Sequence, residues 1–528
     1  MKISDQKIRS EELLIRPRAV ECILAERRLS ALGPQPIPAA RPCSIAKPPH
    51  LGLAISQPGN VLLPRFPLTP TLGDRPLATR VILIRHGQSN FNTRRIIQGR
   101  CDQSVLTDLG RNQATQVAIA LQGLAIDAFY CSPLQRARQT AETICQQLQP
   151  SPPLTTNERL REVDLPLWEG MAVSDVKAQF PEAYDQWKHQ PHEFSMALAS
   201  GTHFPVLSLR DQAKAFWEEI LSRHQGQTVA LVGHNGINRC LLSTALGIGP
   251  DRYHCLLQSN CGISVLNFAG GLGDAVQLES MNLTAHLGSL GGSAVPKPGG
   301  DDRGPQLLLV RHGETEWNRQ GRFQGQIDVP LNETGHGQAA KAGNFLKDVA
   351  IDFAFSSPMA RPKATAEAIL AHHPGLELGL LDTLKEIGHG LWEGKYESEI
   401  EAEYPGLLKQ WQTHPETVQM PEGENLQQVF DRAEQAWAAV LAQAGEVATP
   451  ADRPLTGLVV AHDAVNKALL CQLTGLGPES IWRFKQGNGG VTAICYPDGP
   501  DSLPVLQAMN ITHHLSGTIL DKTAAGAL

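Results

Sequence analysis

The chain has 528 residues, 41% of them hydrophobic and 19% charged, and a formal net charge of −7 at pH 7. This composition is typical of a globular protein with sizeable cores, and the length favours two or three domains. The acidic balance and the lack of an apolar run of about 18 residues argue against nucleic acid or a membrane as the main partner. None of the ten cysteines forms a Cys-x-x-Cys pair, which favours free thiols in a reducing compartment.

Residues 1–78 differ from the rest of the chain because they contain twelve prolines. Proline interrupts helices and strands, so we predict a disordered N-terminal extension. A transit peptide is an alternative, but four glutamates within the first 26 residues argue against it. We therefore expect a cytoplasmic protein, or one of the plastid stroma if the extension is a transit peptide.

The remainder of the chain is a tandem duplication. "VILIRHGQSNFN" from Val81 returns as "LLLVRHGETEWN" from Leu307, and "YCSPLQRARQTAETI" from Tyr130 returns as "FSSPMARPKATAEAI" from Phe355. Further segments match in the same order, up to the closing "MNLTAHL" and "MNITHHL". Because a Gly- and Pro-rich stretch separates the copies, we predict a domain at 79–288, a linker at 289–304, a second domain at 305–516 and a tail at 517–528.

Within the first copy, short apolar runs alternate with helical patterns. In chain order we predict a strand at 80–84, a helix at 107–121, a strand at 128–131, helices at 133–147 and 209–224, and strands at 228–232 and 263–268. Apolar strands flanked by helices are typical of a mostly parallel sheet covered on both faces. The predicted fold class is therefore α/β, with two tandem three-layer αβα domains. Ligands of such sheets bind beyond the carboxyl ends of the strands.

Histidines follow the predicted strands at that edge, and arginines and glutamates accompany them. The residues are Arg85, His86, Arg136, Glu162 and His234 in the first copy, and Arg311, His312, Arg361, Glu386 and His462 in the second. Arginine is permanently charged and grips phosphate oxygens in pairs. A neutral imidazole can attack the bound phosphorus, while a carboxylic acid protonates the leaving group and then activates water. The pattern predicts phosphoryl transfer through a phosphohistidine, and no metal-ligand spacing accompanies it.

Both copies resemble the histidine phosphatase superfamily, the phosphoglycerate-mutase-like enzymes. The family's Arg-His-Gly, its Ser-Pro-x-x-Arg helix start, its Glu before Trp-Glu-Gly and its histidine after a late apolar strand occur in that order in each copy. One Arg-His-Gly is a weak signal, but four ordered motifs found twice are highly specific. The first copy has Gln88 and lacks a Pro-x-Gly-Glu segment, and in this it resembles the tandem 2-carboxyarabinitol-1-phosphate phosphatases of plants and cyanobacteria.

The resemblance implies a role for each matching residue. The catalytic residues would be His86, Glu162, His312 and Glu386. The phosphate-binding residues would be Arg85, Asn92, Gln98, Arg136, His234, Arg311, Asn318, Gln324, Arg361 and His462. No metal or cofactor is implied, and the partner would be a small phosphorylated metabolite. We therefore expect a phosphoric monoester hydrolase for a sugar or sugar-acid phosphate, with 2-carboxy-D-arabinitol 1-phosphate as one candidate.

Two other functions stay open. A phosphoglycerate mutase would carry the same motifs, but the family's mutases have longer insertions and a C-terminal tail that help to close the site, so a phosphatase is favoured. A phosphometabolite-binding regulatory protein with one silent domain is the second. The contrast between Gln88 and Glu314 suggests that the two sites prefer different substrates. The sequence leaves the oligomeric state open.

Several other conspicuous residues are interpreted as structural. Tryptophans in the two Trp-Glu-Gly motifs and a cysteine beside the Ser-Pro motif are expected to pack in the core, whereas four histidines outside the motifs are expected to be surface or structural residues. Two asparagines before the last strands are expected to form turns. These residues are Trp168, Trp392, Cys131, His254, His286, His513, His514, Asn260 and Asn488.

Overall fold

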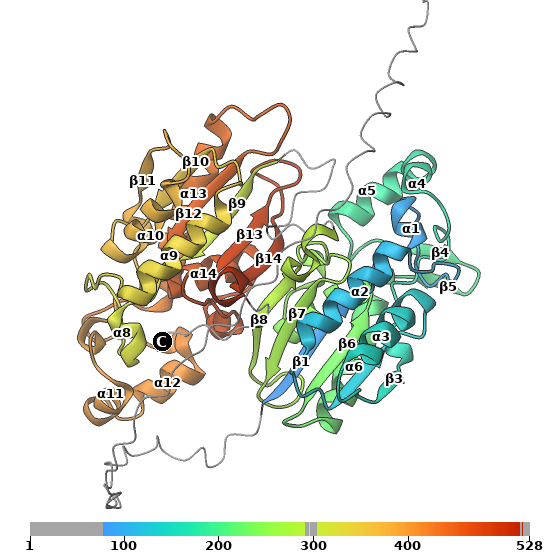
Figure 1. Ribbon diagram of the computed structural model, residues 1–528, viewed down its shortest axis with the longest axis horizontal. Coiled ribbons are helices and arrows are strands. Elements are labelled where there is room, and N and C mark those ends of the chain that lie inside the picture. Colours follow the sequence, from blue (N-terminus) through green and yellow to red (C-terminus); the bar gives the residue numbers. More distant parts are fainter. Residues whose placement is uncertain (1–77, 291–294, 296–303, 518–519, 521–528) are drawn as a thin grey trace, which may run out of the picture. The chain divides into compact units, whose positions relative to one another are not determined.

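The computed structural model describes residues 78–290, 295, 304–517 and 520 (Figure 1). The predicted N-terminal extension therefore lies outside the described residues, apart from its last residue, and so does most of the predicted linker and tail. In the described ranges, no helix is long and apolar enough to cross a membrane.

Six strands form the sheet of the first half of the described chain. In spatial order they are β3 (Leu154–Thr156), β2 (Ala128–Cys131), β6 (Thr228–Gly233), β1 (Thr79–Arg85), β7 (Ile263–Phe268) and β8 (Val276–Leu283). The first four are parallel, and β7 and β8 run antiparallel to their neighbours. The predicted mostly parallel sheet is thus confirmed. The antiparallel β8 was not predicted.

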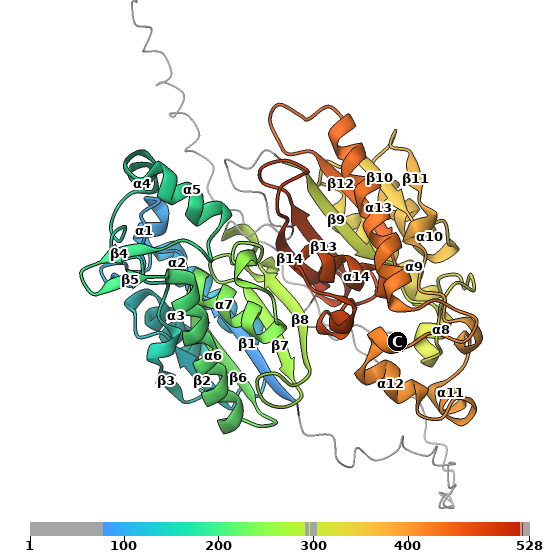
Figure 2. The same ribbon diagram turned by 180° about the vertical axis from the view of Figure 1, so that it is seen from behind.

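The second half repeats this arrangement strand for strand. In spatial order its strands are β11 (Leu378–Leu380), β10 (Phe353–Ser356), β12 (Thr456–Ala461), β9 (Gln306–Arg311), β13 (Val491–Cys495) and β14 (Val505–Ile511). β14 pairs with β8 antiparallel at Met509 and Met281, so one sheet of twelve strands runs through both halves (Figures 1 and 2).

The helices can be given in chain order. The first half contains α1 (Asn90–Thr93), α2 (Asp108–Leu121), α3 (Gln135–Gln147), α4 (Val173–Gln179), α5 (Pro181–His189), α6 (Pro205–Arg223) and α7 (Asn235–Leu246), with a small hairpin of β4 (Met196–Leu198) and β5 (Gly201–His203). The second half contains α8 (Glu316–Gln320), α9 (Glu333–Leu346), α10 (Ala360–Leu370), α11 (Glu397–Glu403), α12 (Leu407–Thr413), α13 (Leu426–Glu446), α14 (Asp463–Leu473) and α15 (His513–Ser516). Short 3-10 helices include η2 (Pro250–Arg252) and η7 (Pro478–Arg483).

Alternating side chains of the strands create two cores, one on each face of the sheet. Val81 and Leu83 of β1 belong to the core that contains residues of α6 and α7, whereas Ile82 and Ile84 belong to the core that contains residues of α2 and α3. Successive strand residues point to opposite faces, so a continuous apolar strand requires helices on both sides. The same division places α13 and α14 opposite α9 and α10 in the second half, which confirms the three-layer αβα architecture.

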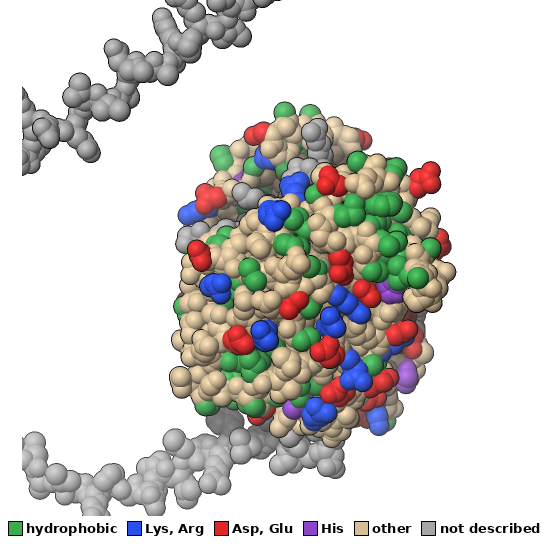
Figure 3. Space-filling view, turned by 90° about the vertical axis from the view of Figure 1, so that its right-hand side faces the viewer, with side chains coloured by type: hydrophobic (Ala, Val, Ile, Leu, Met, Phe, Trp, Pro, Cys, Tyr) green, Lys and Arg blue, Asp and Glu red, His purple; other side chains and the backbone are tan. Residues whose placement is uncertain are grey.

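The predicted elements agree closely with the observed ones. The helix predicted at 107–121 is α2, whose N-cap Thr107 accepts a hydrogen bond from the backbone of Gly110. The helix predicted at 209–224 begins four residues earlier, at Pro205, where proline is tolerated because the first helical N–H has no partner. On the face drawn in Figure 3, acidic and basic side chains are interspersed, which fits the modest net charge.

Candidate active site

The predicted residues meet at the carboxyl ends of the parallel strands. His86 follows β1 and His234 follows β6, and their ring centroids are 5.1 Å apart. His312 and His462 follow β9 and β12, and their centroids are also 5.1 Å apart. The two copies therefore build two equivalent histidine pairs at the edge where α/β sheets bind their ligands.

The backbone fixes the protonation of the first histidine in each pair. His86 Nδ1 lies 2.7 Å from the carbonyl oxygen of Gly87, and His312 Nδ1 lies 2.7 Å from that of Gly313. A carbonyl oxygen only accepts, so Nδ1 must carry the proton and donate it. In the neutral ring, Nε2 then holds the lone pair. Arg361 Nε donates to this lone pair of His312 at 3.3 Å.

Burial keeps these imidazoles neutral. Desolvation lowers the pKa of His86 and of His312 well below 6.5, and the adjacent arginines lower each pKa further. The pKa values of His234 and His462 are lowered in the same way, first by burial and then by the nearest arginine. A neutral ring whose Nε2 holds the lone pair, as in His86 and His312, is suited to nucleophilic attack near pH 7.

One arginine of each site lies in the first turn of a helix and is buried. Arg136 of α3 donates to the carbonyl oxygens of Cys101 at 3.0 Å and Gly99 at 2.9 Å. Arg361 of α10 donates to the equivalent carbonyls of Ile327 and Gly325. These bonds fix the plane of each guanidinium, and both arginines are fully buried. Burial lowers the pKa of Arg361 to about 10, which leaves it charged at neutral pH.

The second arginine of each site is the one that precedes the nucleophile candidate. Arg85 Nη1 donates to the carbonyl oxygen of Gln258 at 2.7 Å, and Arg311 Nη1 donates to that of Gln486 at 2.6 Å. The buried Nε atoms of Arg85, Arg136 and Arg311 have no hydrogen-bond partner among the described residues. Buried donors are rarely left unpaired, so these atoms indicate a site built for an anion.

Glu162 and Glu386 each contact the N-terminus of a helix, α7 in the first half and α14 in the second, which begins directly after the second histidine. The Glu162 carboxylate accepts hydrogen bonds from the backbone N–H groups of Gly236 and Ile237 at 3.1 Å each. The Glu386 carboxylate accepts from Asp463 at 3.0 Å and Ala464 at 3.1 Å. Burial, followed by the Asp463 charge, raises the pKa of Glu386. A carboxyl group with a raised pKa can exchange a proton near neutral pH.

The asparagines and glutamines predicted to bind phosphate line the same region. Asn92 Oδ1 accepts from Ser89 N at 3.0 Å, which closes the N-terminus of α1, and Asn318 does the same for Thr315 in α8. Gln98 Oε1 accepts from the hydroxyl of Ser89, and Gln324 Oε1 accepts from that of Thr315. The amide oxygens are therefore occupied by protein groups.

The Gln88 and Glu314 pair has a local structural explanation. Gln88 Oε1 accepts from the hydroxyl of Thr107 at 3.0 Å, and Glu314 Oε1 accepts from the amide of Asn332 at 2.8 Å. Thr107 and Asn332 are the N-caps of α2 and α9. The change from Gln88 to Glu314 between the two copies is therefore accompanied by a change of the N-cap residue to which this side chain is hydrogen-bonded, from Thr107 to Asn332.

Three kinds of residue support the site without having been predicted to do so from the sequence. Ser132 Oγ lies 2.8 Å from His234 Nε2, and Thr140 Oγ1 accepts from the backbone of Gly87 at 3.1 Å. Asn260 Nδ2 donates to the carbonyl oxygen of His86 at 2.9 Å, so the expected turn residue also positions the nucleophile candidate. The second half repeats all three contacts with Ser357, Thr365 and Asn488. Their identity in both copies is the signal that could have revealed them.

The two sites differ most at the residue after the second histidine. It is Asn235 in the first half and Asp463 in the second. Asp463 Oδ1 lies 3.4 Å from Arg311 Nη1, and its Oδ2 lies 2.7 Å from Lys467 Nζ. All three groups are buried. The second site therefore contains an ion triad in which the Asp463 carboxylate engages Arg311, one of the arginines predicted to bind phosphate.

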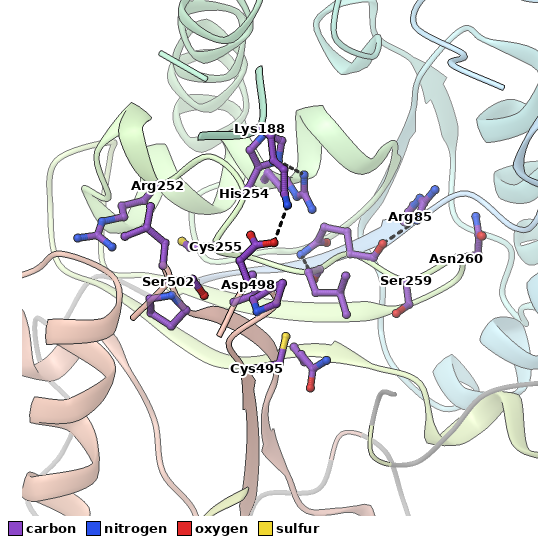
Figure 4. A pocket seen from close by; sticks show the side chains of 18 of the residues that line it. Arg85, Lys188, Arg252, His254, Cys255, Ser259, Asn260, Cys495, Asp498 and Ser502 are labelled. Atoms are coloured by element: carbon purple, nitrogen blue, oxygen red, sulfur yellow. Dashed lines mark hydrogen bonds and ion pairs between the residues drawn. The ribbon is translucent and has the colours of Figure 1, made fainter. Parts of the chain in front are cut away.

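A large cavity lies beside Arg85 and Asn260, but His86, Arg136, Glu162 and His234 do not line it. A space of about 1460 Å³ is lined by Arg85 and Asn260 at one end and by Arg252 and Ser502 at the other (Figure 4). Lys188 and Asp498 face each other across it at 2.7 Å.

The residues interpreted as structural behave as expected. Trp168, Trp392 and Cys131 are buried. His254 Nε2 lies 2.9 Å from the carbonyl oxygen of Trp187, and His286 and His514 bond backbone carbonyls in the same way. His513 packs edge-on against Phe345.

Known proteins resemble the chain over most of its length. Residues 81–281 and 307–511 each match the histidine phosphatase superfamily (branch 1). The 2-carboxy-D-arabinitol-1-phosphatase of Triticum aestivum is 32% identical over 86% of this chain and 90% of that protein. A probable 2-carboxy-D-arabinitol-1-phosphatase of Arabidopsis thaliana is 31% identical over 83% of this chain and 88% of that protein. Phosphoserine phosphatase 1 of Hydrogenobacter thermophilus is 32% identical, over 40% of this chain and 94% of that protein.

Matches of this extent, on top of two complete sets of site residues, identify the family. The chain belongs to the histidine phosphatase superfamily, as a tandem member and a phosphoric monoester hydrolase.

Proposed function

We propose that both sites hydrolyse a small phosphate monoester through a phosphohistidine, without a metal ion. His86 and His312 are the nucleophiles, and the paired arginines with His234 and His462 bind the phosphoryl group. The observation that carries the proposal is the hydrogen bond from Nδ1 to the following glycine carbonyl, which leaves the Nε2 lone pair beside the arginines.

The mechanism has two half-reactions. In the first, His86 Nε2 forms a bond to phosphorus, the bond from phosphorus to the ester oxygen breaks, and Glu162 gives its proton to the leaving alkoxide. In the second, Glu162 takes a proton from water, whose oxygen attacks phosphorus and releases phosphate from Nε2. Charge on the transferring oxygens is balanced by the arginines, whose positions are fixed before the substrate arrives. His312 and Glu386 carry out the same steps in the second site.

We propose a sugar or sugar-acid phosphate as the substrate. The first compound to test is 2-carboxy-D-arabinitol 1-phosphate, because the two relatives that span most of this chain carry that activity in their names. Serine phosphate is the natural comparison compound, given the name of the bacterial relative.

A screen of phosphorylated metabolites with four proteins tests the proposal. The proteins are the wild type, His86→Ala, His312→Ala and the double variant, with His336→Ala on the exposed surface of α9 as a control. We expect each single variant to lose the activity of one site, the double variant to lose all activity, and the control to match the wild type. Rapid quenching should trap acid-labile phosphate on the wild type.

Two results would replace this proposal. Conversion of 3-phosphoglycerate to 2-phosphoglycerate without release of phosphate would identify a mutase. Binding of sugar phosphates without turnover, and without a trapped phosphohistidine, would identify a phosphometabolite-binding regulatory protein.

A further inference from the structure

The matching Met-Asn segments near the end of each half lie where the halves meet. Asn282 belongs to β8 and Asn510 to β14, the two strands that pair with each other. Both asparagines are buried, and their φ angles are +53° and +55°. Asparagine tolerates this left-handed conformation far better than branched residues do. The proposed catalytic steps use neither residue.

Within its own half, each asparagine holds the turn that carries the phosphate-binding arginine. Asn282 Oδ1 accepts from the backbone of Ser259 at 2.7 Å, and the preceding carbonyl, of Gln258, is the one that fixes Arg85. Asn510 Oδ1 accepts from the backbone of Gly487 at 2.8 Å, and the carbonyl of Gln486 fixes Arg311.

The other end of each amide crosses to the opposite half. Asn282 Nδ2 donates to the carbonyl oxygen of Gln507 in β14 at 2.7 Å. Asn510 Nδ2 donates to the carbonyl oxygen of Glu279 in β8 at 2.8 Å. The two crossing bonds are reciprocal, and each is buried. A short chain of hydrogen bonds therefore runs from each arginine through its turn and its asparagine to the backbone of the other half.

We propose that Asn282 and Asn510 are positioning residues that fasten the phosphate-binding arginine of each site to the strand of the opposite half. The arginine turn then has its correct position only while β8 and β14 are paired. The pairing of the halves is thus part of each phosphate site rather than a mere link between two independent enzymes. This inference rests on the proposed function, because it assumes that both sites bind phosphate.

Aspartate is the substitution that separates the two ends of the amide. In Asn282→Asp, Oδ1 can still accept from Ser259, and the left-handed backbone is still tolerated. The second carboxylate oxygen cannot donate and would face the carbonyl oxygen of Gln507 instead. Within the half, Asn282 Nδ2 also donates to Ser259 Oγ at 3.2 Å, and this hydroxyl can turn to donate to the new carboxylate. The variant therefore removes the crossing bond while it keeps the bonds within the half. Asn510→Asp does the same for the second half.

The test measures binding of inorganic phosphate to the full chain by calorimetry. Arg361→Ala is used as the background in which the first site alone binds phosphate, and Arg136→Ala as the background for the second. Loss of a buried hydrogen bond that positions a phosphate-binding arginine is expected to weaken the affinity for phosphate by about tenfold. We expect Asn282→Asp to weaken the first site about tenfold and leave the second unchanged, and Asn510→Asp to do the reverse.

Ser280→Ala on β8 is the matched control, because its buried hydroxyl makes no hydrogen bond among the described residues. It should leave both affinities unchanged. If Asn282→Asp fails to fold, Asn282→Gly keeps the backbone conformation but removes both ends of the amide, so it tests the positioning role of Asn282 as a whole and must weaken the first site selectively. Unchanged affinity in a folded variant, or equal weakening of both sites, would overturn the inference. Failure of both unmutated sites to bind phosphate would instead overturn the proposed function.

Discussion

Removing the charge of Asp463 should strengthen phosphate binding in the second site. In Asp463→Asn, Arg311 loses the carboxylate that lies 3.4 Å away, while Lys467 keeps its positive charge. The first site already has asparagine at this position. The substitution therefore converts the second site to the electrostatic arrangement of the first.

The size of the effect follows from the geometry. Phosphate bound on the far side of the guanidinium would lie roughly 8 Å from the Asp463 carboxylate, and with an effective dielectric constant of about 20 each unit of its charge is repelled by about 2 kcal/mol. This energy corresponds to roughly thirtyfold in affinity. Because the substituted amide can still polarise the arginine, we expect at least a tenfold decrease in the inhibition constant of inorganic phosphate.

The pH profile should move at the same time. Burial and the Asp463 charge both raise the pKa of Glu386, so removing that charge lowers it. A general acid must be protonated, and activity is therefore lost as pH rises through its pKa. The alkaline limb of the second site should shift to lower pH in Asp463→Asn.

The assay uses the His86→Ala background, in which the second site alone turns over, and thermal unfolding to show that buried Lys467 is tolerated without its partner. Asn235→Asp in the His312→Ala background is the reciprocal control and should weaken phosphate binding in the first site. The reasoning would be refuted if both substitutions changed the inhibition constant in the same direction or left it unchanged.

Three further predictions follow from the contacts. Glu162→Gln and Glu386→Gln should each lower kcat of their own site by about a hundredfold or more, while phosphate still binds, because only proton transfer is lost; single-site backgrounds measure this. Ser132→Ala should lower kcat/KM of the first site by roughly five- to tenfold, because His234 Nε2 loses its partner, and a wild-type value would exclude this role. Unfolding temperatures should fall as pH drops below about 6.5, because the unfolded chain protonates the four site histidines whose folded pKa values lie well below 6.5, and a flat profile from pH 6.5 to 5 would contradict their burial as neutral rings.

The repeated motifs made the fold and the main site residues predictable. Strand ends place side chains at one edge of a parallel sheet, so the positions of His86 and His234 after apolar runs were enough to bring them together. Supporting residues such as Thr140 and Asn260 were not predicted, because their function depends on hydrogen bonds to backbone groups that are distant in the sequence. Such supporting residues can be recognised in the sequence only when the two copies are aligned and residues identical in both are noted.

Charge interactions within the site were equally hidden. The sequence drew attention to Gln88 and Glu314, which turn out to hold helix N-caps. The electrostatic difference lies instead at Asn235 and Asp463, and its meaning depends on Lys467, one helical turn further along. Side chains four residues apart on a helix are neighbours, but only the packing of that helix against β9 brings the pair to Arg311.

The distribution of differences between the halves bears on whether one site is silent. The nucleophile candidates, the buried arginines and the glutamates share most of their contacts between the halves, including the bond from Nδ1 to a glycine carbonyl. The change in charge lies at the start of α7 and α14, where the second half has Asp463 in place of Asn235. Asp463 is paired with Arg311 and with Lys467, and the Lys467 position already holds a cation, Arg239, in the first half. Loss of function would leave unpaired charges or missing nucleophiles, whereas a compensated change preserves the machinery and alters how strongly it holds phosphate. We therefore infer that the second site is retuned rather than silenced, with weaker phosphate binding than the first.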